Sequence, residues 1–280
     1  MHNFELYLAD VLKHLKDSRV KEAMNYSLLN GGKRVRPMLL FATIKAYGLD
    51  ESIAYPVAAG IEMIHTYSLI HDDLPAMDND TLRRGKPTCH VAFDEGCAIL
   101  AGDALLTHAF EFALKSSNDA EINCKIVQAF VDAAGANGMI LGQIKDIETE
   151  FNHPKTIDDL KLIHLYKTGK LLTLPLLCGA YLAKKDEDIL ILSKVGMLLG
   201  LAFQMQDDIL DVTSTTEELG KNINSDFENN KTTYVSILSV EQTRSLAEQH
   251  LLEAKDLLNQ CNFNKTFILE VIDFLLSRQK

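Results

Sequence analysis

Residues 71–80 read HDDLPAMDND and hold four aspartates within nine positions, at the end of a long apolar run. Arg83 and Arg84 follow at once. An isolated acidic cluster is usually a solvated surface segment. However, a second cluster, QDDILD at residues 206–211, repeats the pair of aspartates and again follows an apolar run. Two clusters of the same kind indicate one site shared between two helices.

The aspartates of these clusters favour a bound cation, because neighbouring negative charges raise each other's pKa unless positive charge lies between them. A site made of oxygen ligands suits a hard cation such as Mg²⁺, which keeps several waters and is often shared with substrate phosphates. A calcium-binding hand does not fit. A loop beginning at Asp78 would place Arg83 where glycine is needed and Cys89 where glutamate is needed.

The composition narrows the class of the protein. The chain has 280 residues, 47% of them hydrophobic, which allows one large domain or two small ones with a substantial core. A net charge of −11 argues against a nucleic-acid surface.

The five cysteines form no C-x-x-C pair, and no basic segment of a signal peptide opens the chain. The apolar stretches 171–183 and 197–203 are too short to span a bilayer or are interrupted. We predict a cytoplasmic protein without membrane insertion.

The spacing of apolar residues predicts helices throughout, and no convincing run alternates apolar and polar residues. Thr156 should cap one helix, and Ser239 with Gln242 forms a capping box that opens another. We predict an all-α fold, a single domain over residues 1–280 with about ten or more helices around a central cavity. The expected helices cover residues 6–15, 24–29, 52–74, 92–115, 120–135, 138–150, 156–169 and 186–212, with two more after residue 239.

Proline predicts a bend in the first aspartate segment. Pro75 should end or kink the helix predicted over residues 52–74. Asp72 and Asp78 are six residues apart and would lie on different faces of a straight helix. A break after Leu74 would allow Asp78 to bend back toward Asp72.

Gly169 and Pro175 should likewise bend or break the apolar segment that follows Lys167. A lysine beside such a break is a candidate for an inward-facing site. The commoner alternative is a surface lysine whose stem lies along the protein.

Residues 31–37, GGKRVRP, place Lys33 and Arg36 at the start of a helix that Pro37 favours. Positive side chains beside the positive end of a helix form an anion site. An ordinary basic loop explains this segment equally well when it is considered alone. A Walker loop is excluded, because the spaced glycines and the Ser/Thr after the lysine are missing.

These features together describe a site for a ligand with a polyanionic head and an apolar tail. Gln204 and the aspartates of the second cluster share one side of their helix. Metal ions and cationic side chains can stabilise a leaving diphosphate. The basic groups in question are Lys33, Arg36, Arg83, Arg84, Lys167, Lys221 and Lys231.

The same motifs resemble those of the trans-prenyl diphosphate synthases. The segment HDDLPAMDNDTLRRGKPT, beginning at His71, is similar to the first aspartate-rich motif of that family, and QDDILD is similar to the second. GGKRVRP, KTG and a loop with Lys221, Asp226 and Lys231 follow the family's order. The resemblance covers nearly the whole chain and is strongest to the bacterial farnesyl diphosphate synthases.

The resemblance implies a set of roles. Three Mg²⁺ would be held between the clusters and an allylic diphosphate by Asp72, Asp73, Asp78, Asp207, Asp208 and Asp211, with Asp207 the strongest candidate of the second set. The allylic diphosphate would be bound by Arg83, Lys167, Lys221 and Lys231. Isopentenyl diphosphate would be bound by Lys33, Arg36, His65 and Arg84, although a lone histidine on an apolar helix is more often a core residue. Thr168 and Gln204 would lie near the developing allylic cation.

The implied reaction is a head-to-tail condensation of isopentenyl diphosphate with dimethylallyl and geranyl diphosphate, by ionisation, condensation and elimination. The products would be farnesyl diphosphate and pyrophosphate, and the departing pyrophosphate would remove the last proton. The family also implies a homodimer. Two residues depart from its pattern: Thr81 stands where another aspartate is usual, and Lys170 follows KTG where a small residue is common.

Three interpretations remain: a farnesyl diphosphate synthase, a geranylgeranyl diphosphate synthase, and a catalytically silent subunit of a heteromeric synthase. The third is the weakest, because the chain keeps both aspartate clusters. A terpene cyclase is disfavoured, since it would not need Lys33, Arg36 and His65 for a second diphosphate. The absence of tryptophan also leaves little aromatic surface for guiding cations.

Product length depends on the residues beneath the first cluster. Tyr67 lies five residues before Asp72, so about 7.5 Å deeper along the helix axis. On an ideal helix Ser68 lies directly below Asp72, and it is too small to block a growing chain. The geometry therefore leaves the stop undecided. The resemblance favours an aromatic stop at Tyr67 and a fifteen-carbon product.

Overall fold

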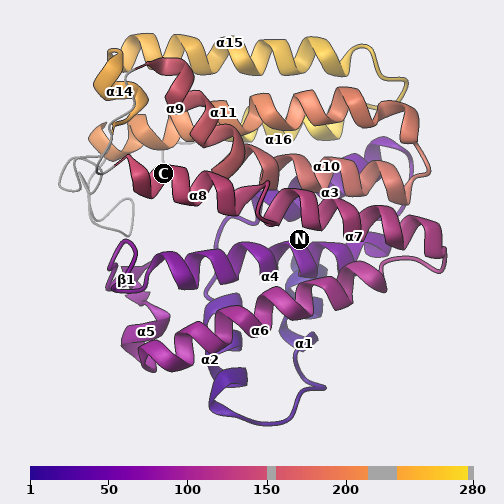
Figure 1. Ribbon diagram of the computed structural model, residues 1–280. Coiled ribbons are helices and arrows are strands. Elements are labelled where there is room, and N and C mark those ends of the chain that lie inside the picture. The colour runs from indigo at the N-terminus through magenta and orange to yellow at the C-terminus, as the bar shows by residue number, and fades with distance from the viewer. Residues whose placement is uncertain (150–155, 214–231, 277–280) are drawn as a thin grey trace.

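The computed structural model describes residues 1–149, 156–213 and 232–276, and these residues are almost entirely helical (Figure 1). The all-α prediction is confirmed. The described α-helices are α1 (His2–Asp10), α2 (Arg19–Leu28), α3 (Val35–Ala46), α4 (Tyr55–Asp72), α5 (Cys89–Ala92), α6 (Glu95–Leu114), α7 (Ala120–Ala134), α8 (Met139–Glu148), α9 (Ile157–His164), α10 (Lys170–Leu182), α11 (Ile189–Thr213), α14 (Tyr234–Ile237), α15 (Val240–Leu258) and α16 (Thr266–Leu276). The shorter elements are the 3₁₀ helices η1 (Glu51–Ala54) and η3 (Asp186–Asp188), the π-helix η2 (Leu165–Gly169), and the strands β1 (Leu82–Arg83) and β2 (Lys86–Pro87).

The predicted capping residues begin their helices. The Ser239 side chain accepts from the N–H of Gln242 at 3.2 Å, and the Gln242 side chain accepts from the N–H of Ser239 at 3.1 Å. Thr156 and Asp159 form the same reciprocal pair at α9. Each pair satisfies N–H groups that the first turn of a helix leaves without partners. The first helix differs from its prediction, since α1 ends at Asp10 and turns follow it.

The predicted break in the first aspartate segment is confirmed. Helix α4 ends at Asp72, and the N–H of Asp78 donates to the carbonyl oxygen of Asp72 at 2.9 Å. The chain therefore bends Asp78 back over the end of α4. Of the predicted bend or break at Pro175, a break is wrong, because Pro175 lies inside α10. The irregularity near Lys167 is instead η2, which ends at Gly169.

A short hairpin that the sequence analysis did not predict follows this turn. Strand β1 pairs antiparallel with β2, with Arg83 opposite Lys86. Arg84 and Gly85 between the strands both have positive φ, 55° and 74°. Positive φ at both central residues is typical of the type I′ turn that joins two strands. Two-residue strands are too short to show alternation, and arginine is not a typical residue of such a turn.

The helices pack around two apolar clusters. The first is built largely from α4, α6 and α7, and the second from α3, α11, α15 and α16. Helix α10 packs on α11 and on α3 and α7, so it joins the two halves. Helices α4 and α11 both end at the left side of the view in Figure 1. The packing therefore brings the ends that carry the aspartate clusters to the same side of the bundle.

Two helices in the described part of the chain, Glu95–Leu114 and Asp186–Thr213, are long and apolar enough to cross a membrane by length and composition alone. The sequence analysis had expected shorter or interrupted apolar stretches. Within the bundle, α6 packs along α4 and α11 packs along α15. Core helices of soluble proteins meet the same criterion, so this length is weak evidence for a membrane segment.

Candidate functional site

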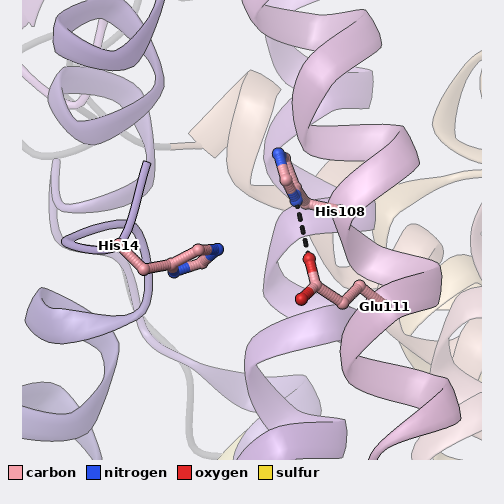
Figure 2. Close-up of side chains that lie close together, drawn as sticks. All are labelled: His14, His108 and Glu111. Carbon is pink, nitrogen blue, oxygen red and sulfur yellow. Dashed lines mark hydrogen bonds and ion pairs between the residues drawn. The ribbon is translucent and has the colours of Figure 1, made fainter. Parts of the chain in front are cut away.

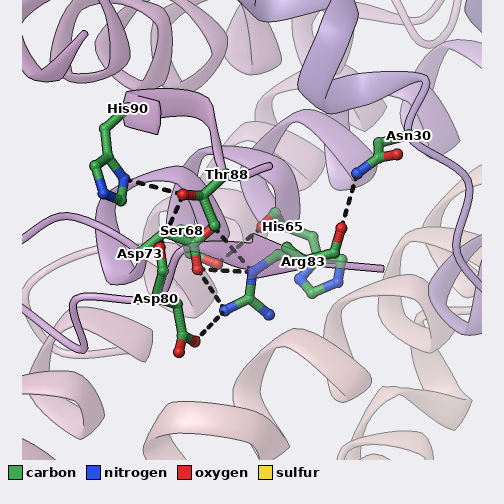
Figure 3. A network of polar contacts seen from close by, with 8 residues as sticks. All are labelled: Asn30, His65, Ser68, Asp73, Asp80, Arg83, Thr88 and His90. Atoms are coloured by element: carbon green, nitrogen blue, oxygen red, sulfur yellow. Dashed lines mark hydrogen bonds and ion pairs between the residues drawn. The ribbon is translucent and has the colours of Figure 1, made fainter. Parts of the chain in front are cut away.

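The first aspartate cluster is tied to the hairpin through one arginine (Figure 3). Asp73 is 3% exposed, and Arg83 Nε lies 2.7 Å from its Oδ1 and 3.0 Å from its Oδ2. Arg83 Nη2 also pairs with Asp80 Oδ2 at 3.3 Å, and the Arg83 carbonyl accepts from Asn30 Nδ2 at 3.2 Å. Arg83 therefore joins the end of α4, the turn after it and the segment that follows α2.

The carboxyl groups at the end of α4 are poorly stabilised as anions. Burial raises the pKa of Asp72 to about 6; the charges of Asp78 and Asp73 also raise it, whereas Lys167 and Arg83 lower it. Burial likewise raises the pKa of Asp73 to about 6, against the effect of the hydrogen bond from Arg83. Because desolvation penalises the charged form, a cation bound beside these groups would stabilise both of them.

The aspartates of α11 differ in their surroundings. Asp208 is 2% exposed, and both of its oxygens accept hydrogen bonds. Oδ1 accepts from Gln204 Nε2 at 3.0 Å, and Oδ2 accepts from the backbone N–H of Tyr234 at 2.8 Å. Asp211 is also buried, whereas Asp207 is half-buried. Asp208 therefore helps to hold α14 against the end of α11, and Asp207 is the more accessible of the three.

Two consecutive residues of η2 connect the two clusters. Lys167 Nζ forms an ion pair with Asp146 of α8, and the charge of Asp72 also acts on this lysine. The next residue, Thr168, donates from Oγ1 to Gln204 Oε1 at 3.2 Å, on the helix of the second cluster. The residues of η2 therefore interact with both the end of α4 and α11.

Two glycines allow the neighbouring helices to pack directly on η2. A Cβ on Gly142 of α8 would lie 2.1 Å from the backbone nitrogen of Lys167. A Cβ on Gly200 of α11 would lie 2.3 Å from the Cα of Gly169. Both distances are too short for any residue larger than glycine without a backbone shift. The segment that carries Lys167 is therefore held between α8 and α11, and π-helical turns of this kind occur often at functional sites.

Lys167 keeps its charge in this position. Burial by itself lowers the pKa of a lysine, but the charges of Asp146 and Asp72 outweigh it and raise the pKa of Lys167 above its usual value. The side chain is therefore a cation at neutral pH. An ammonium group beside the first cluster suits a bound phosphate group.

The basic loop (residues 31–36) and the hairpin bring two more arginines together. Arg84 Nη1 donates to the carbonyl oxygen of Gly31. Burial lowers the pKa of Arg36 to about 10, and the charge of Arg84 lowers it further, whereas Glu62 and Asp207 raise it. Arg36 Nε is buried and has no hydrogen-bond partner among the described residues. Cations that repel one another and a buried N–H group without an acceptor both favour a bound anion.

His65 lies at the same group of cations. Burial lowers the pKa of His65 well below its usual value, and the charge of Arg36 lowers it again. His65 is therefore neutral at pH 7 and can both donate and accept a hydrogen bond. Lys33, on the basic loop, is exposed.

The sequence analysis missed a buried ion pair beneath the basic loop. Arg34 Nη1 lies 2.6 Å from Glu62 Oε2, and each side chain is 3% exposed. Arg34 Nε pairs with Glu5 Oε1 at 2.9 Å, and Nη2 donates to the Leu28 carbonyl oxygen at 3.0 Å. The signal was present, since Glu62 is an acid within a mainly apolar run, one turn before His65. Asp146, the partner of Lys167, was also not among the candidates.

Tyr67 lies beneath the first cluster, as predicted from its position on α4. Its ring is 5% exposed and meets His71 edge to face, with centroids 5.8 Å apart. Burial raises the pKa of Tyr67 to about 12, and the charge of Asp72 also raises it. Its hydroxyl is buried without a hydrogen-bond partner in the described part of the chain. Ser68 is half-buried, and its hydroxyl donates to the His65 carbonyl oxygen at 2.9 Å.

The remaining predictions concern Lys221, Lys231, Thr81 and Lys170. Lys221 and Lys231, with Asp226, fall outside the described residues. Thr81 is exposed, and its carbonyl accepts from the N–H of Thr88 at 3.0 Å, so this residue helps to close the hairpin. Lys170 Nζ lies 5.8 Å from the centre of the Tyr166 ring and lines a cavity of about 550 Å³ between α7, α10 and α11.

Comparisons with known proteins agree with this architecture. A family model described as polyprenyl synthetase matches residues 17–266. The chain is 44% identical to farnesyl diphosphate synthase from Bacillus subtilis (strain 168) over 263 residues, which cover 92% of this chain and 88% of that protein. It is 42% identical to geranylgeranyl diphosphate synthase from Cyanophora paradoxa over 262 residues, which cover 92% and 87%.

Solved structures match over the same length. The crystal structure of geranyltransferase from Helicobacter pylori, complexed with magnesium and isoprenyl diphosphate, is 35% identical and has a TM-score of 0.87. The match covers 98% of this chain and 93% of that chain. Since the family model and these relatives match along most of the sequence, this protein is an enzyme of the polyprenyl synthetase family.

Proposed function

We propose that this enzyme is a Mg²⁺-dependent prenyltransferase that condenses isopentenyl diphosphate with dimethylallyl and geranyl diphosphate to give farnesyl diphosphate and pyrophosphate. The observation that carries the proposal is the position of two consecutive residues of η2. Lys167 is charged beside the first aspartate cluster, while Thr168 is bonded to Gln204 one turn before the second cluster. A ligand with an anionic head would be bound by both halves at once.

The donor set fits magnesium. It consists of carboxylate oxygens, which Mg²⁺ prefers, and the raised pKa of Asp72 and Asp73 reflects charge that a cation would stabilise. We assign Asp72, Asp78 and Asp207 as the principal ligands and retain Asp73, Asp208 and Asp211 in the wider set, for up to three ions as the family implies. Bound Mg²⁺ would supply the charge that stabilises the leaving diphosphate.

The cationic side chains of the chain divide between two diphosphates. Lys167 and Arg83 lie at the first cluster and would bind the allylic diphosphate, as would Lys221 and Lys231. The oxygens of Thr168 and Gln204 would face the positive charge that develops on the allylic carbon when its diphosphate leaves. Lys33, Arg36, His65 and Arg84 would bind isopentenyl diphosphate.

Arg36→Ala tests this division. Arg36 has a buried N–H group without an acceptor among the described residues, so its removal should weaken one bound anion. A hydrogen bond to a charged group contributes about 1.5–3 kcal/mol, so we expect the KM for isopentenyl diphosphate to rise roughly 10- to 150-fold. The KM for geranyl diphosphate should change much less. Steady-state kinetics with each substrate varied in turn measures both values.

The control for this prediction is Arg19→Ala, an arginine whose side chain is 60% exposed and paired with Asp94. Neither KM should change in that variant. An equal increase for both substrates in Arg36→Ala would show that the arginine does not distinguish the two diphosphates.

The fifteen-carbon product depends on Tyr67. Its buried ring lies below Asp72, where a growing chain would extend from the diphosphate. We expect the wild-type enzyme to stop mainly at fifteen carbons and Tyr67→Ala to make longer products, because the ring no longer closes the end of the site. Incubation with Mg²⁺, isopentenyl diphosphate and an allylic diphosphate, followed by chromatography of the dephosphorylated products, measures chain length.

Two variants control for other causes of a change in product length. Tyr67→Phe keeps the ring and should still stop at fifteen carbons. Ser68→Ala should also leave chain length unchanged, because the Ser68 hydroxyl is bonded within its own helix. A twenty-carbon product from the wild type would favour a geranylgeranyl diphosphate synthase. No turnover by the purified chain alone would favour a silent subunit.

We also propose that residues 1–280 form one domain and that two copies form a homodimer, as the family implies. Large apolar side chains are exposed on three successive helices, and such residues are often covered in assemblies. They are Ile99, Leu100, Leu114, Val131, Ile140 and Ile144. A monomeric mass by light scattering would contradict the dimer.

We propose that the enzyme is located in the cytoplasm. The five cysteines are free, which is consistent with a reducing compartment.

A further inference from the structure

Two histidines and a glutamate meet where the turn after α1 approaches α6 (Figure 2). One ligand atom from each of His14, His108 and Glu111 lies within 4.8 Å of the other two. His108 and Glu111 are three residues apart on α6 and therefore face the same side. His108 Nδ1 lies 3.0 Å from Glu111 Oε2. In Figure 2 the ring of His14 points across the gap toward these two side chains.

Glu111 is in a charge state that suits a metal ligand. Hydrogen bonds from Lys115 and His108 lower the pKa of Glu111, so its carboxyl group is ionised. Lys115 Nζ binds Oε1 at 2.6 Å, whereas Oε2 faces His108. The Lys115 side chain is 70% exposed, so it can move into solvent when another cation binds Glu111. The rings of His14 and His108 meet edge to face with centroids 6.1 Å apart.

A cavity of about 290 Å³ adjoins the cluster, and His14, Glu111 and Pro56 are among the residues that line it. The cavity provides room for water ligands beside the three side chains. Pro56 opens α4 and lies sixteen residues before Asp72, so about 24 Å away along the helix axis. The cluster is thus near the opposite end of α4 from the aspartates that we assign to magnesium.

We propose that His14, His108 and Glu111 form a second metal site, for a divalent transition-metal ion of the zinc or nickel class. Two imidazole nitrogens and one carboxylate oxygen are ligands that such ions prefer, whereas Mg²⁺ selects oxygen ligands. Ligand atoms in a site of this kind lie about 2.0–2.2 Å from the metal. His14 is exposed, so its ring has room to rotate toward an ion bound by His108 and Glu111. The bound ion ties the segment between α1 and α2 to α6.

Nickel binding tests the site. Tag-free protein is first treated with a chelator and then titrated with Ni²⁺ by calorimetry in the presence of saturating Mg²⁺, which occupies the oxygen-ligand sites. We expect one Ni²⁺ per chain, bound through these residues. His14→Gln and His108→Gln should each weaken this binding at least about tenfold, because each removes one protein ligand. Since His14 is exposed, His14→Gln should fold normally, which circular dichroism will check.

The matched control is His250→Gln, which removes a histidine of α15 outside the cluster and should leave the affinity unchanged. Ni²⁺ should also raise the thermal midpoint of the wild type and of His250→Gln, but not that of His14→Gln. Absence of the single site, or wild-type affinity in His14→Gln, would show that His108 and Glu111 form only an ordinary surface ion pair. Prenyltransferase activity in Mg²⁺ is a separate measurement, so either result leaves the proposed function untouched.

Discussion

Asp72→Ala and Asp207→Ala are expected to lower turnover by about 10²–10³-fold or more, the magnitude seen when one group that stabilises transition-state charge is removed. Each variant removes a principal ligand from one of the two clusters. Because burial raises the pKa of Asp72 to about 6, the metal-free fold holds this negative charge less favourably than the unfolded chain does. Asp72→Ala should therefore lose activity without losing stability, which a thermal melt of the metal-free protein can show.

Two controls separate metal binding from folding. Asp10→Ala removes an aspartate that is 61% exposed, and it should change neither activity nor stability. Asp208→Asn should lower the thermal midpoint as well as activity, because one oxygen of Asp208 accepts a hydrogen bond from Gln204 and the other accepts one from Tyr234.

Excess chelator should abolish turnover by the wild type, and added Mg²⁺ should restore it. Full activity in excess chelator would rule out the metal requirement.

Glu62→Gln is expected to destabilise the fold by about 3–5 kcal/mol, because it leaves the buried Arg34 guanidinium without its closest counter-charge. Both side chains of the pair are 3% exposed, so water cannot replace the lost carboxylate. Arg34 also has a left-handed backbone conformation, with φ 50°, immediately before α3. Loss of the pair should therefore also disturb the basic loop. Chemical denaturation measures the stability, and kinetics measures the KM for isopentenyl diphosphate.

Glu5→Gln is the matched control, because Glu5 is the second carboxylate partner of Arg34 but is 42% exposed. Exposed ion pairs contribute about 0–1 kcal/mol, so this variant should stay close to wild type. We expect Glu62→Gln to raise the KM for isopentenyl diphosphate more than that for the allylic substrate at temperatures where the protein is folded. An unchanged KM in a destabilised but folded variant would restrict the pair to a structural role.

Much of the helical architecture follows from local signals. The capping residues Thr156 and Ser239 begin their helices, and Pro75 accompanies the break that bends Asp78 back to Asp72. These features could be predicted because each depends on residues only a few positions apart. The hairpin at Arg84 and Gly85 could not, because its strands are two residues long and its turn lacks a typical sequence.

The sequence by itself determined that two aspartate clusters end long helices and that basic groups accompany them. Only the tertiary structure decided which of these groups already have internal partners. Asp73 is bonded to Arg83, Asp208 to the backbone of Tyr234, and Arg34 to Glu62. The last two contacts join residues more than twenty-five positions apart, and no periodic pattern encodes them. The physical reason is that burial and charge pairing depend on which helices pack together, and residues far apart in the sequence decide that packing.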